Sequence, residues 1–562
     1  MSSPLPTLRR SAGPLLLELD LSRGVAETPP ATPIRAVGAR GVPVLQALVE
    51  ALRRAERDRE VVGLVAHVGP RPITLAQSGE LRDAVASFRG SGKVAVAWTE
   101  SFGELDAGNV GYHLASAFEE IWLQPSGGVG LTGVVARAVF VREALDRLGV
   151  EPQLGQRHEY KTAADTFLRS EMSEAGREMA HRLAESATAT IVGDVAASRG
   201  LDPAAVRELV DRAPLTAAEA LEARLVDRLG YRDEAYAALR SRLGDVRLLY
   251  LERYGRRRER RGTLRRAVTG RHRPVVALVR ASGPIHLGRA ASFPWAGPNV
   301  GSDTLGATLR AAGRDPAVKA VVLRVDSPGG SYVASDAIRR EVLALRETGR
   351  PVIASMATVA GSGGYYIAMP CDAVVAGAAT LTGSIGVLGG KQVVRDALGR
   401  VGVRVDTESV GAQAEMFSVQ RPFTDEEWRR LEAWLDQVYA DFTEKAAADR
   451  GMPVERLREV ARGRVWTGAD ALAHGLVDRL GGLEEAVAVA CERLGVRRDD
   501  VDVRVLPHLG ILRRLRPPES SERPAAAHIE PGGRALLAGA LAVLGLPPAA
   551  GVLTLPVVWE LA

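Results

Sequence analysis

Two copies of one sequence pattern lie about 250 residues apart, and this duplication limits the possible folds more than any other feature. The first copy, residues 215–230, reads LTAAEALEARLVDRLG, and the second, residues 466–481, reads WTGADALAHGLVDRLG. A similar offset brings AGNVGYHLA, residues 107–115, onto AGSGGYYIA, residues 360–368. Because 562 residues exceed one ordinary domain, the repeat predicts two related large domains.

Short apolar runs alternate with helical patterns in both copies. The strand-like runs are residues 61–65, 94–97, 275–279, 320–325 and 352–354. Short buried strands that alternate with helices predict an α/β fold with a mostly parallel sheet in each copy. We expect an N-terminal domain over residues 1–252, a basic linker over 253–273 and a C-terminal domain over 274–506. Residues 507–562 form a Pro/Arg-rich connection and an apolar tail.

Composition is that of a soluble globular protein, with 46% hydrophobic and 25% charged residues. The net charge is only +5, and the sequence contains no zinc-finger or RNA-binding signature, so nucleic acid is not an expected partner. The linker, residues 253–273, holds ten arginines against one glutamate. Such a run is either a solvated linker or a contact with anionic lipid head groups. Cys371 and Cys491 lack metal-ligand spacing, and we expect neither metal nor cofactor.

Two apolar segments bear on membrane association. Residues 14–19 are interrupted by Glu18 and followed by Asp20, so they predict a first strand rather than a signal peptide or spanning helix. Residues 535–559 carry no charge but are interrupted by Gly545 and three prolines. This pattern favours a tail packed on the protein, or an apolar hairpin that touches a bilayer, over a membrane-spanning helix.

A glycine pair follows the strand-like run that ends at Val325. The motif Asp326-Ser-Pro-Gly-Gly-Ser331 precedes a helical pattern, and adjacent glycines at such a turn expose backbone N–H groups to a ligand. These donors bind phosphate or stabilise an oxyanion, and the lack of Gly-Lys-Ser/Thr argues against a nucleotide P-loop. At this place the first copy has VGPRPI, residues 68–73, whose prolines lack N–H groups. A plain tight turn is the alternative reading.

The second motif, AGSGGYY at residues 360–366, places Ser362 between small residues before a helical pattern. This arrangement presents a hydroxyl at a helix N-terminus, with the Gly363 N–H as a second oxyanion donor. It is not the Gly-x-Ser-x-Gly elbow, because Ala360 stands two residues before the serine. Taken alone, the pattern favours a helix N-cap over a nucleophile.

A serine nucleophile needs a base, and lysine usage narrows the candidates. The chain has five lysines against 68 arginines. Arginine does not lose its proton in proteins, whereas a buried lysine does, so each lysine is a candidate base. Lys161 has apolar neighbours that favour burial, and serine–lysine pairs are an established variant of nucleophilic catalysis. His158 and Lys391 are the rival bases.

Four motifs together resemble the long, duplicated form of the signal peptide peptidase A (protease IV) family. They are LRVDSPGGS (323–331), AGSGGYY (360–366), TLTGSIG (380–386) and YKTA (160–163). The resemblance covers residues 15–500 for the most part and implies a ClpP/crotonase-like fold in each copy. It also implies a homotetramer that degrades short apolar peptides, with cleaved signal peptides as the family's substrate.

By carry-over from the resemblance, Ser362 is the nucleophile and Lys161 is the general base from the other domain. Gly329, Gly330 and Gly363 supply the oxyanion hole. Ser384 matches the serine that orients the lysine.

Long-form relatives commonly begin with a transmembrane helix, which we do not expect here. The expectation is therefore peripheral membrane association through the basic linker or the apolar tail, on either the cytoplasmic or the extracytoplasmic face. Two other functions stay open: a crotonase-type acyl-CoA hydratase or hydrolase, and a non-catalytic membrane-associated scaffold.

Overall fold

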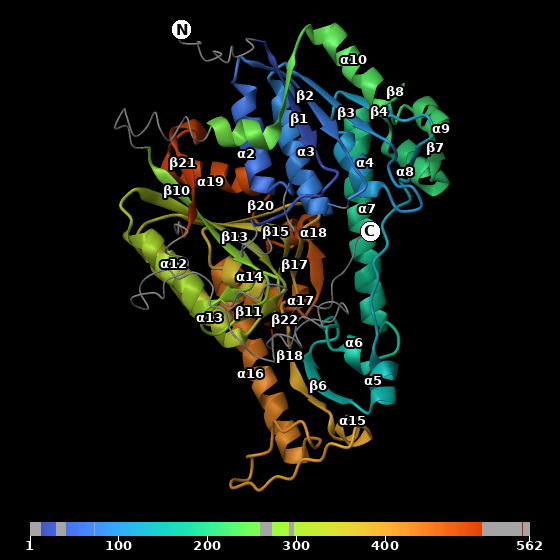
Figure 1. The fold of residues 1–562 in the computed structure, drawn as a ribbon. Coiled ribbons are helices and arrows are strands. Elements are labelled where there is room, and N and C mark those ends of the chain that lie inside the picture. Colours follow the sequence, from blue (N-terminus) through green and yellow to red (C-terminus); the bar gives the residue numbers. More distant parts are fainter. Residues whose placement is uncertain are drawn as a thin grey trace, which may run out of the picture.

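The chain forms two α/β modules, each built around a largely parallel sheet (Figure 1). The computed structural model describes residues 13–29, 41–71, 73–258, 273–290, 297–507 and 553–554. We call residues 13–250 the first module and residues 275–506 the second module. The predicted fold class, a duplicated α/β fold, is confirmed.

The first module contains a six-stranded sheet in the order β8-β4-β3-β2-β1-β9. Its strands are β1 (Leu15–Asp20), β2 (Val61–His67), β3 (Val94–Thr99), β4 (Glu120–Leu123), β8 (Arg228–Leu229) and β9 (Arg247–Tyr250). Every neighbouring pair is parallel. The apolar run at residues 14–19 is therefore mostly a strand, as predicted, and its burial explains its composition.

The second module repeats this order in its own sheet. The sequence β20-β16-β15-β13-β10-β21 matches β8-β4-β3-β2-β1-β9 position by position. These strands are β10 (Val275–Ser282), β13 (Val318–Ser327), β15 (Val352–Gly361), β16 (Ala373–Ala376), β20 (Arg479–Leu480) and β21 (Asp502–Leu506). The sheet also includes β17 (Leu381–Gly383) and β19 (Val465–Thr467), which pair antiparallel. The internal repeat in the sequence thus corresponds to a repeat in topology.

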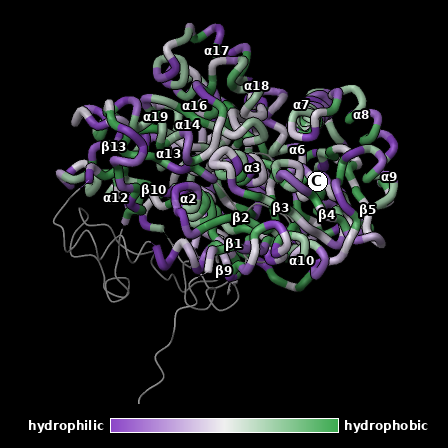
Figure 2. The backbone as a smooth tube through the Cα atoms, turned by 90° about the horizontal axis from the view of Figure 1, so that it is seen from above, coloured by the Kyte–Doolittle hydropathy of each residue, from purple (hydrophilic) through white to green (hydrophobic). Residues whose placement is uncertain are grey.

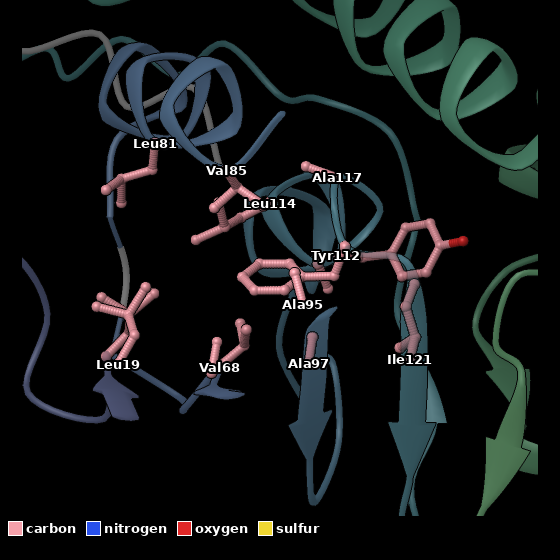
Figure 3. Packing of buried hydrophobic residues seen from close by; sticks show 14 of the residues in the cluster. Leu19, Val68, Leu81, Val85, Ala95, Ala97, Tyr112, Leu114, Ala117 and Ile121 are labelled. Atoms are coloured by element: carbon pink, nitrogen blue, oxygen red, sulfur yellow. The ribbon is translucent and has the colours of Figure 1, made fainter. Parts of the chain in front are cut away.

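Apolar strand residues and helices form the core of each module. In the first module, α2 (Leu45–Glu56), α3 (Leu75–Gly90) and α4 (Asn109–Ala115) enclose one large cluster of buried side chains. Figure 3 shows part of this cluster, where Tyr112 lies among aliphatic side chains from strands and helices. Its hydroxyl donates to the Leu225 carbonyl at 2.7 Å, which satisfies the one polar atom of a buried ring. In Figure 2 the hydrophobic residues concentrate along β2 and β3.

Helix α7 (Glu174–Arg199) and strand β6 (Glu151–Arg157) both connect the first module to the second. Helix α7 leaves the first module and runs down one side of the molecule (Figure 1), where Met179 and Leu183 pack on Leu381 and Val465 of the second. Strand β6 pairs antiparallel along its full length with β18 (Val387–Val393). Together they place residues 158–164, which lie between β6 and α7, against the second module.

The β6–β18 ribbon carries two short helices, α5 (Arg142–Leu148) and α15 (Arg395–Arg400). Both lie wholly in the described part of the chain, and neither has a buried residue. Helix α16 (Asp425–Arg450) packs against both strands of the ribbon and continues into the second module. We call the ribbon with α5, α15 and residues 401–423 the arm.

Several sequence expectations fall wholly or partly outside the described residues. These are most of the basic linker (residues 259–272) and the apolar tail except residues 553–554.

Cys371 and Cys491 are both buried and unpaired, so the structure contains no disulfide between them. Among the described helices, none combines the length and apolar character needed to cross a bilayer.

A candidate serine–lysine active site

Ser362 lies at a sharp turn between the end of β15 and the start of α14 (Gly363–Ala368). Its backbone has φ 54° and ψ −114°, a conformation that L residues rarely adopt and that tends to occur at functional sites. The backbone N–H donates to the Gly383 carbonyl at 2.8 Å. Although Ser362 occupies the N-cap position, its side chain makes no capping hydrogen bond. Its hydroxyl therefore remains available for another partner.

That partner is Lys161, which the first module supplies. The Lys161 Nζ lies 2.9 Å from the Ser362 Oγ, and both side chains are fully buried. Nζ also lies 3.0 Å from the Ser384 Oγ and donates to the Ser384 carbonyl at 3.1 Å. The turn that carries Ser384 has φ 49° at this residue. Lys161, Ser362 and Ser384 thus form one hydrogen-bonded group with members from both modules.

Burial favours the neutral form of the Lys161 amine. Removal of Lys161 from water lowers its pKa well below the ordinary value, because desolvation disfavours the charged ammonium. A neutral amine has a lone pair that accepts a proton from a hydroxyl, which an ammonium lacks. The Ser384 carbonyl and hydroxyl occupy the remaining hydrogen-bonding directions of Nζ. When the amine is neutral, its two N–H groups can be donated to the Ser384 oxygens, which leaves its lone pair for Ser362.

The glycine loop lies directly beside the serine. Gly329 and Gly330 form the short strand β14, with φ of 99° and 152°. A Cβ atom on Gly329 would lie 2.6 Å from the Gly363 nitrogen, and one on Gly363 would lie 3.1 Å from the Gly330 nitrogen. Any side chain here would separate the loop from the serine turn, so glycine is required. The Gly329 N–H already donates to the Ser327 hydroxyl at 3.2 Å.

A segment from far along the chain covers this loop, which the sequence reasoning missed. Strand β22 (Leu553–Thr554) pairs antiparallel with β14, with Gly330 opposite Leu553 and Gly329 opposite Thr554. The Leu553 side chain is fully buried within the apolar cluster of the second module. Its carbonyl oxygen would be 2.1 Å from a Cβ on Gly329. The edge of β14 thus accepts an extended strand next to Ser362.

The rival bases are engaged elsewhere. Lys391 Nζ donates to the Met416 carbonyl at 2.8 Å and lies 4.1 Å from the centre of the Phe423 ring. The His158 ring stacks edge-on against Tyr439, with the ring centres 4.6 Å apart, and partial burial lowers the pKa of its imidazole. Lys161 is the lysine that the structure brings to Ser362.

The equivalent place in the first module has a different chemistry. Asn109, which aligns with Ser362, donates to the Gly133 carbonyl at 2.7 Å and accepts from the Gly133 N–H at 3.1 Å. A Ser78–His113–Asp194 chain lies nearby, with distances of 2.7 and 2.8 Å. Ser78 and His113 are buried between α3 and α4, and Arg82 of α3 donates to the Ser116 and Ser198 hydroxyls at 2.6 and 2.9 Å, so these polar groups tie α3, α4 and α7 together. This chain is structural.

Next to the glycine loop, buried charges join the two modules. Arg324 of β13 donates to Glu80 of α3 at 2.5 Å and to Glu27 at 2.7 Å. Glu80 also accepts from the Leu483 N–H at 3.0 Å. Two residues beyond Arg324, burial raises the pKa of Asp326 to about 6, and this carboxyl accepts from the Val359 N–H at 3.2 Å. These contacts hold the end of β13 in place, and with it the glycine loop that follows.

Across the described ranges, histidine, cysteine and acidic side chains nowhere gather in a group of three or more that suits a metal ion.

Comparison with known proteins identifies the family of the chain. The sequence model of peptidase family S49 matches residues 88–246 and 344–497, one segment in each module. The chain is 34% identical over 472 residues to protease 4 of Salmonella typhi, with coverage of 81% of this chain and 73% of that protein. It is 33% identical over 457 residues to the chloroplastic serine protease SPPA of Arabidopsis thaliana, with coverage of 80% and 66%.

Two solved structures align with part of the chain at low sequence identity and low TM-score. The S97A mutant of the 1510-N membrane-bound stomatin-specific protease is 14% identical, covers 42% of this chain and 99% of its own, and has a TM-score of 0.26. The N165D mutant of ClpP1 from Listeria monocytogenes is 11% identical, covers 37% and 93%, and has a TM-score of 0.24.

The family match covers more than half of the chain and lies in both modules, and the protease 4 relative is matched over most of its length. The resemblance to the protease IV family is confirmed, and the peptidase interpretation is favoured over the crotonase and scaffold alternatives. The chain belongs to peptidase family S49, a family of serine proteases.

Proposed function

We propose that this protein hydrolyses peptides with Ser362 as nucleophile and Lys161 as general base. The observation that carries the proposal is the 2.9 Å separation between Lys161 Nζ and Ser362 Oγ, both fully buried and supplied by different modules. Burial keeps the amine neutral, and only a neutral amine accepts the serine proton. Ser384 orients Nζ from the opposite side.

The chemistry follows from these positions. Ser362 Oγ attacks the scissile carbonyl carbon while Lys161 takes the hydroxyl proton and later delivers it to the leaving amine. The negative charge on the carbonyl oxygen is stabilised by the N–H groups of Gly330 and Gly363, with Gly329 holding the loop in position. Water, deprotonated by Lys161, then hydrolyses the ester and releases Ser362.

The substrate in this proposal is a short, extended and apolar peptide. Support comes from β22, because this segment already pairs antiparallel with β14 and buries an apolar side chain, Leu553, beside Ser362. Strand addition reads backbone rather than sequence, while the apolar surroundings that Leu553 occupies would favour an apolar side chain at that place. Remnants of cleaved signal peptides have this chemistry, and we propose them as the physiological substrate.

We also propose a homotetramer in which the arms meet. Helices α5 and α15 occupy equivalent places in the two copies, and neither has a buried residue in the single chain. Apolar side chains stand exposed on the arm, notably Leu148, Val401 and Phe417 at 60%, 73% and 68%. Exposed apolar patches of this kind mark protein contacts. Because each chain carries both versions of the arm, the α15 side of one copy can dock on the α5 side of the next and close a ring.

Membrane contact in this proposal is peripheral, through the arginine-rich residues 253–273 or the apolar residues 535–559. Flotation with anionic vesicles tests this contact. A variant that ends at Pro531 should leave the lipid fraction if the tail binds, and a variant with five of the linker arginines changed to glutamine should leave it if the linker binds. Failure of the intact chain to float would refute the contact.

Activity on a peptide library is the decisive experiment for the reaction. Ser362→Ala should abolish cleavage, and Lys161→Arg should do the same because arginine keeps the charge but cannot accept a proton. Lys319→Arg, at an exposed lysine, serves as the matched control and should cleave like the wild type. Retained cleavage by Lys161→Arg would exclude the proposed base.

A further inference from the structure

One turn of the second module contacts both the proposed base and the serine that orients it. Residues 462–464 (Arg-Gly-Arg) lie between α17 (Val454–Val460) and β19. No sequence pattern links them to Lys161 or Ser384. Arg462 and Gly463 both have positive φ, 52° and 82°. We call residues 462–464 the positioning turn.

Gly463 is packed against the backbone of Lys161. A Cβ atom added at Gly463 would lie 2.5 Å from the Lys161 nitrogen, 2.6 Å from its Cβ and 2.7 Å from its Cα. These atoms cannot move aside as the end of a flexible side chain would. The hydrogen atom of glycine is therefore the largest group that fits, and the turn acts as a stop behind the lysine.

The same turn holds the segment that carries Ser384. The Ser384 N–H donates to the Arg464 carbonyl at 2.7 Å, and the Gly463 N–H donates to the Ile385 carbonyl at 2.8 Å. Gly386 completes the packing, because a Cβ there would lie 2.7 Å from the Gly463 Cα. Lys161 and Ser384 come from different modules, yet this one backbone sets the position of each.

Side chains anchor the positioning turn to the first module. The Arg464 guanidinium lies 4.7 Å from the centre of the Tyr160 ring and 4.4 Å from that of Trp466, and it pairs with Glu178 at 2.9 Å. Arg462 pairs with Glu159. Through Tyr160 and Glu159, both arginines contact residues within two positions of Lys161 in the sequence, so they resist withdrawal of the lysine from the second module.

We propose that the Arg462–Arg464 turn is a positioning element of the reaction, which sets the distance from the Lys161 amine to Ser362 through Gly463. The proposal rests on the proposed function and names the residues that maintain its geometry. Displacement of a catalytic group by about 1 Å costs ~100-fold in rate. Displacement would also admit water to Lys161 and so make the amine easier to protonate.

The test compares Gly463→Ala with Gly349→Ala. Gly349 has φ 78° and nothing within 4 Å of an added Cβ, so its replacement introduces the same kind of backbone strain without displacing a neighbour. We expect Gly463→Ala to lose about 100-fold in kcat/KM and in the rate of labelling by a fluorophosphonate. We also expect the acid limb of its pH–activity profile to move to higher pH. Gly349→Ala should keep the wild-type kcat/KM, labelling rate and pH profile. Matching activity and pH profiles for the two variants would overturn the proposal.

A second variant covers the case in which Gly463→Ala does not fold. Arg464→Ala removes the anchor between Tyr160 and Trp466 without adding atoms to the core. We expect a fall in kcat with unchanged KM and the same shift of the acid limb to higher pH. An acid limb at the wild-type pH would contradict the positioning role of the turn. Lys161→Arg is measured in parallel. If it stays active, the proposed base is wrong. If it is inactive while both turn variants behave like wild type, only the positioning role is wrong.

Discussion

A buried neutral lysine should leave a signature in the pH dependence of stability. The perturbation is Lys161→Met, made in the Ser362→Ala background, which removes the proposed nucleophile so that neither protein digests itself. Burial lowers the pKa of Lys161 in the folded chain, while the unfolded chain keeps the ordinary value of about 10.4. Between these two pKa values the unfolded state binds one more proton, so the lysine destabilises the fold there, and increasingly so as the pH falls.

The size of the effect follows from the difference of one bound proton between the unfolded and the folded state. For a fully buried group, linkage gives up to about 1.4 kcal/mol of unfolding free energy per pH unit within that window. The lysine protein should therefore gain stability relative to the methionine protein as pH rises, and the difference should level off above about pH 10.4. Methionine has a similar length and apolar character, so it fills the site without the ionisable group.

Urea denaturation followed by tryptophan fluorescence, at half-unit steps from pH 7 to pH 10, measures this difference. Lys319→Met in the same background is the matched control, because Lys319 is exposed and its removal should leave the pH dependence unchanged. If the difference in unfolding free energy between the lysine protein and the Lys161→Met variant does not change with pH, the reasoning is refuted. Lys161 would then be protonated in the folded state as well as in the unfolded state.

Three further predictions concern other parts of the site. Ser384→Ala removes the hydroxyl 3.0 Å from Lys161 Nζ and should lower kcat by about 10-fold with little change in KM, as steady-state kinetics would show. Leu553→Asp places a charge in an apolar cluster and should release β22 from β14, which lowers KM for peptides while kcat stays the same; an unchanged KM would mean that β22 does not compete. Arg324→Leu leaves Glu80 buried without its cation and should lower the unfolding free energy by about 3–5 kcal/mol in urea, with partial recovery in the double variant that adds Glu80→Gln.

The repeat in the sequence was enough to predict two related α/β modules, because a duplicated pattern of buried strands and helices folds twice in the same way. The match between the two strand orders shows why this inference works. The resemblance named Ser362 and Lys161, and the scarcity of lysine made Lys161 a better candidate than usual. Their 2.9 Å approach depends on contacts across 201 sequence positions, which no local pattern encodes.

Other features could not be predicted for physical reasons. The two-residue strand β22 is too short to show periodicity, and its partner β14 lies more than 200 residues earlier in the chain. The proposed role of Gly463 comes from one missing methyl group in a tertiary contact, and the motif around it resembles any surface turn. The strained φ of Ser362 is likewise set by the surrounding turn, because the small residues around a serine also suit an ordinary helix cap.

The division of the dyad between the two modules has a consequence for synthesis in the cell. As the ribosome releases the chain, the amine at position 161 emerges long before the hydroxyl at position 362, and each remains harmless without the other. In the proposed mechanism, cleavage capacity appears only after the β6–β18 ribbon has formed and brought Lys161 to Ser362, so an unfinished or broken polypeptide would not attack its neighbours.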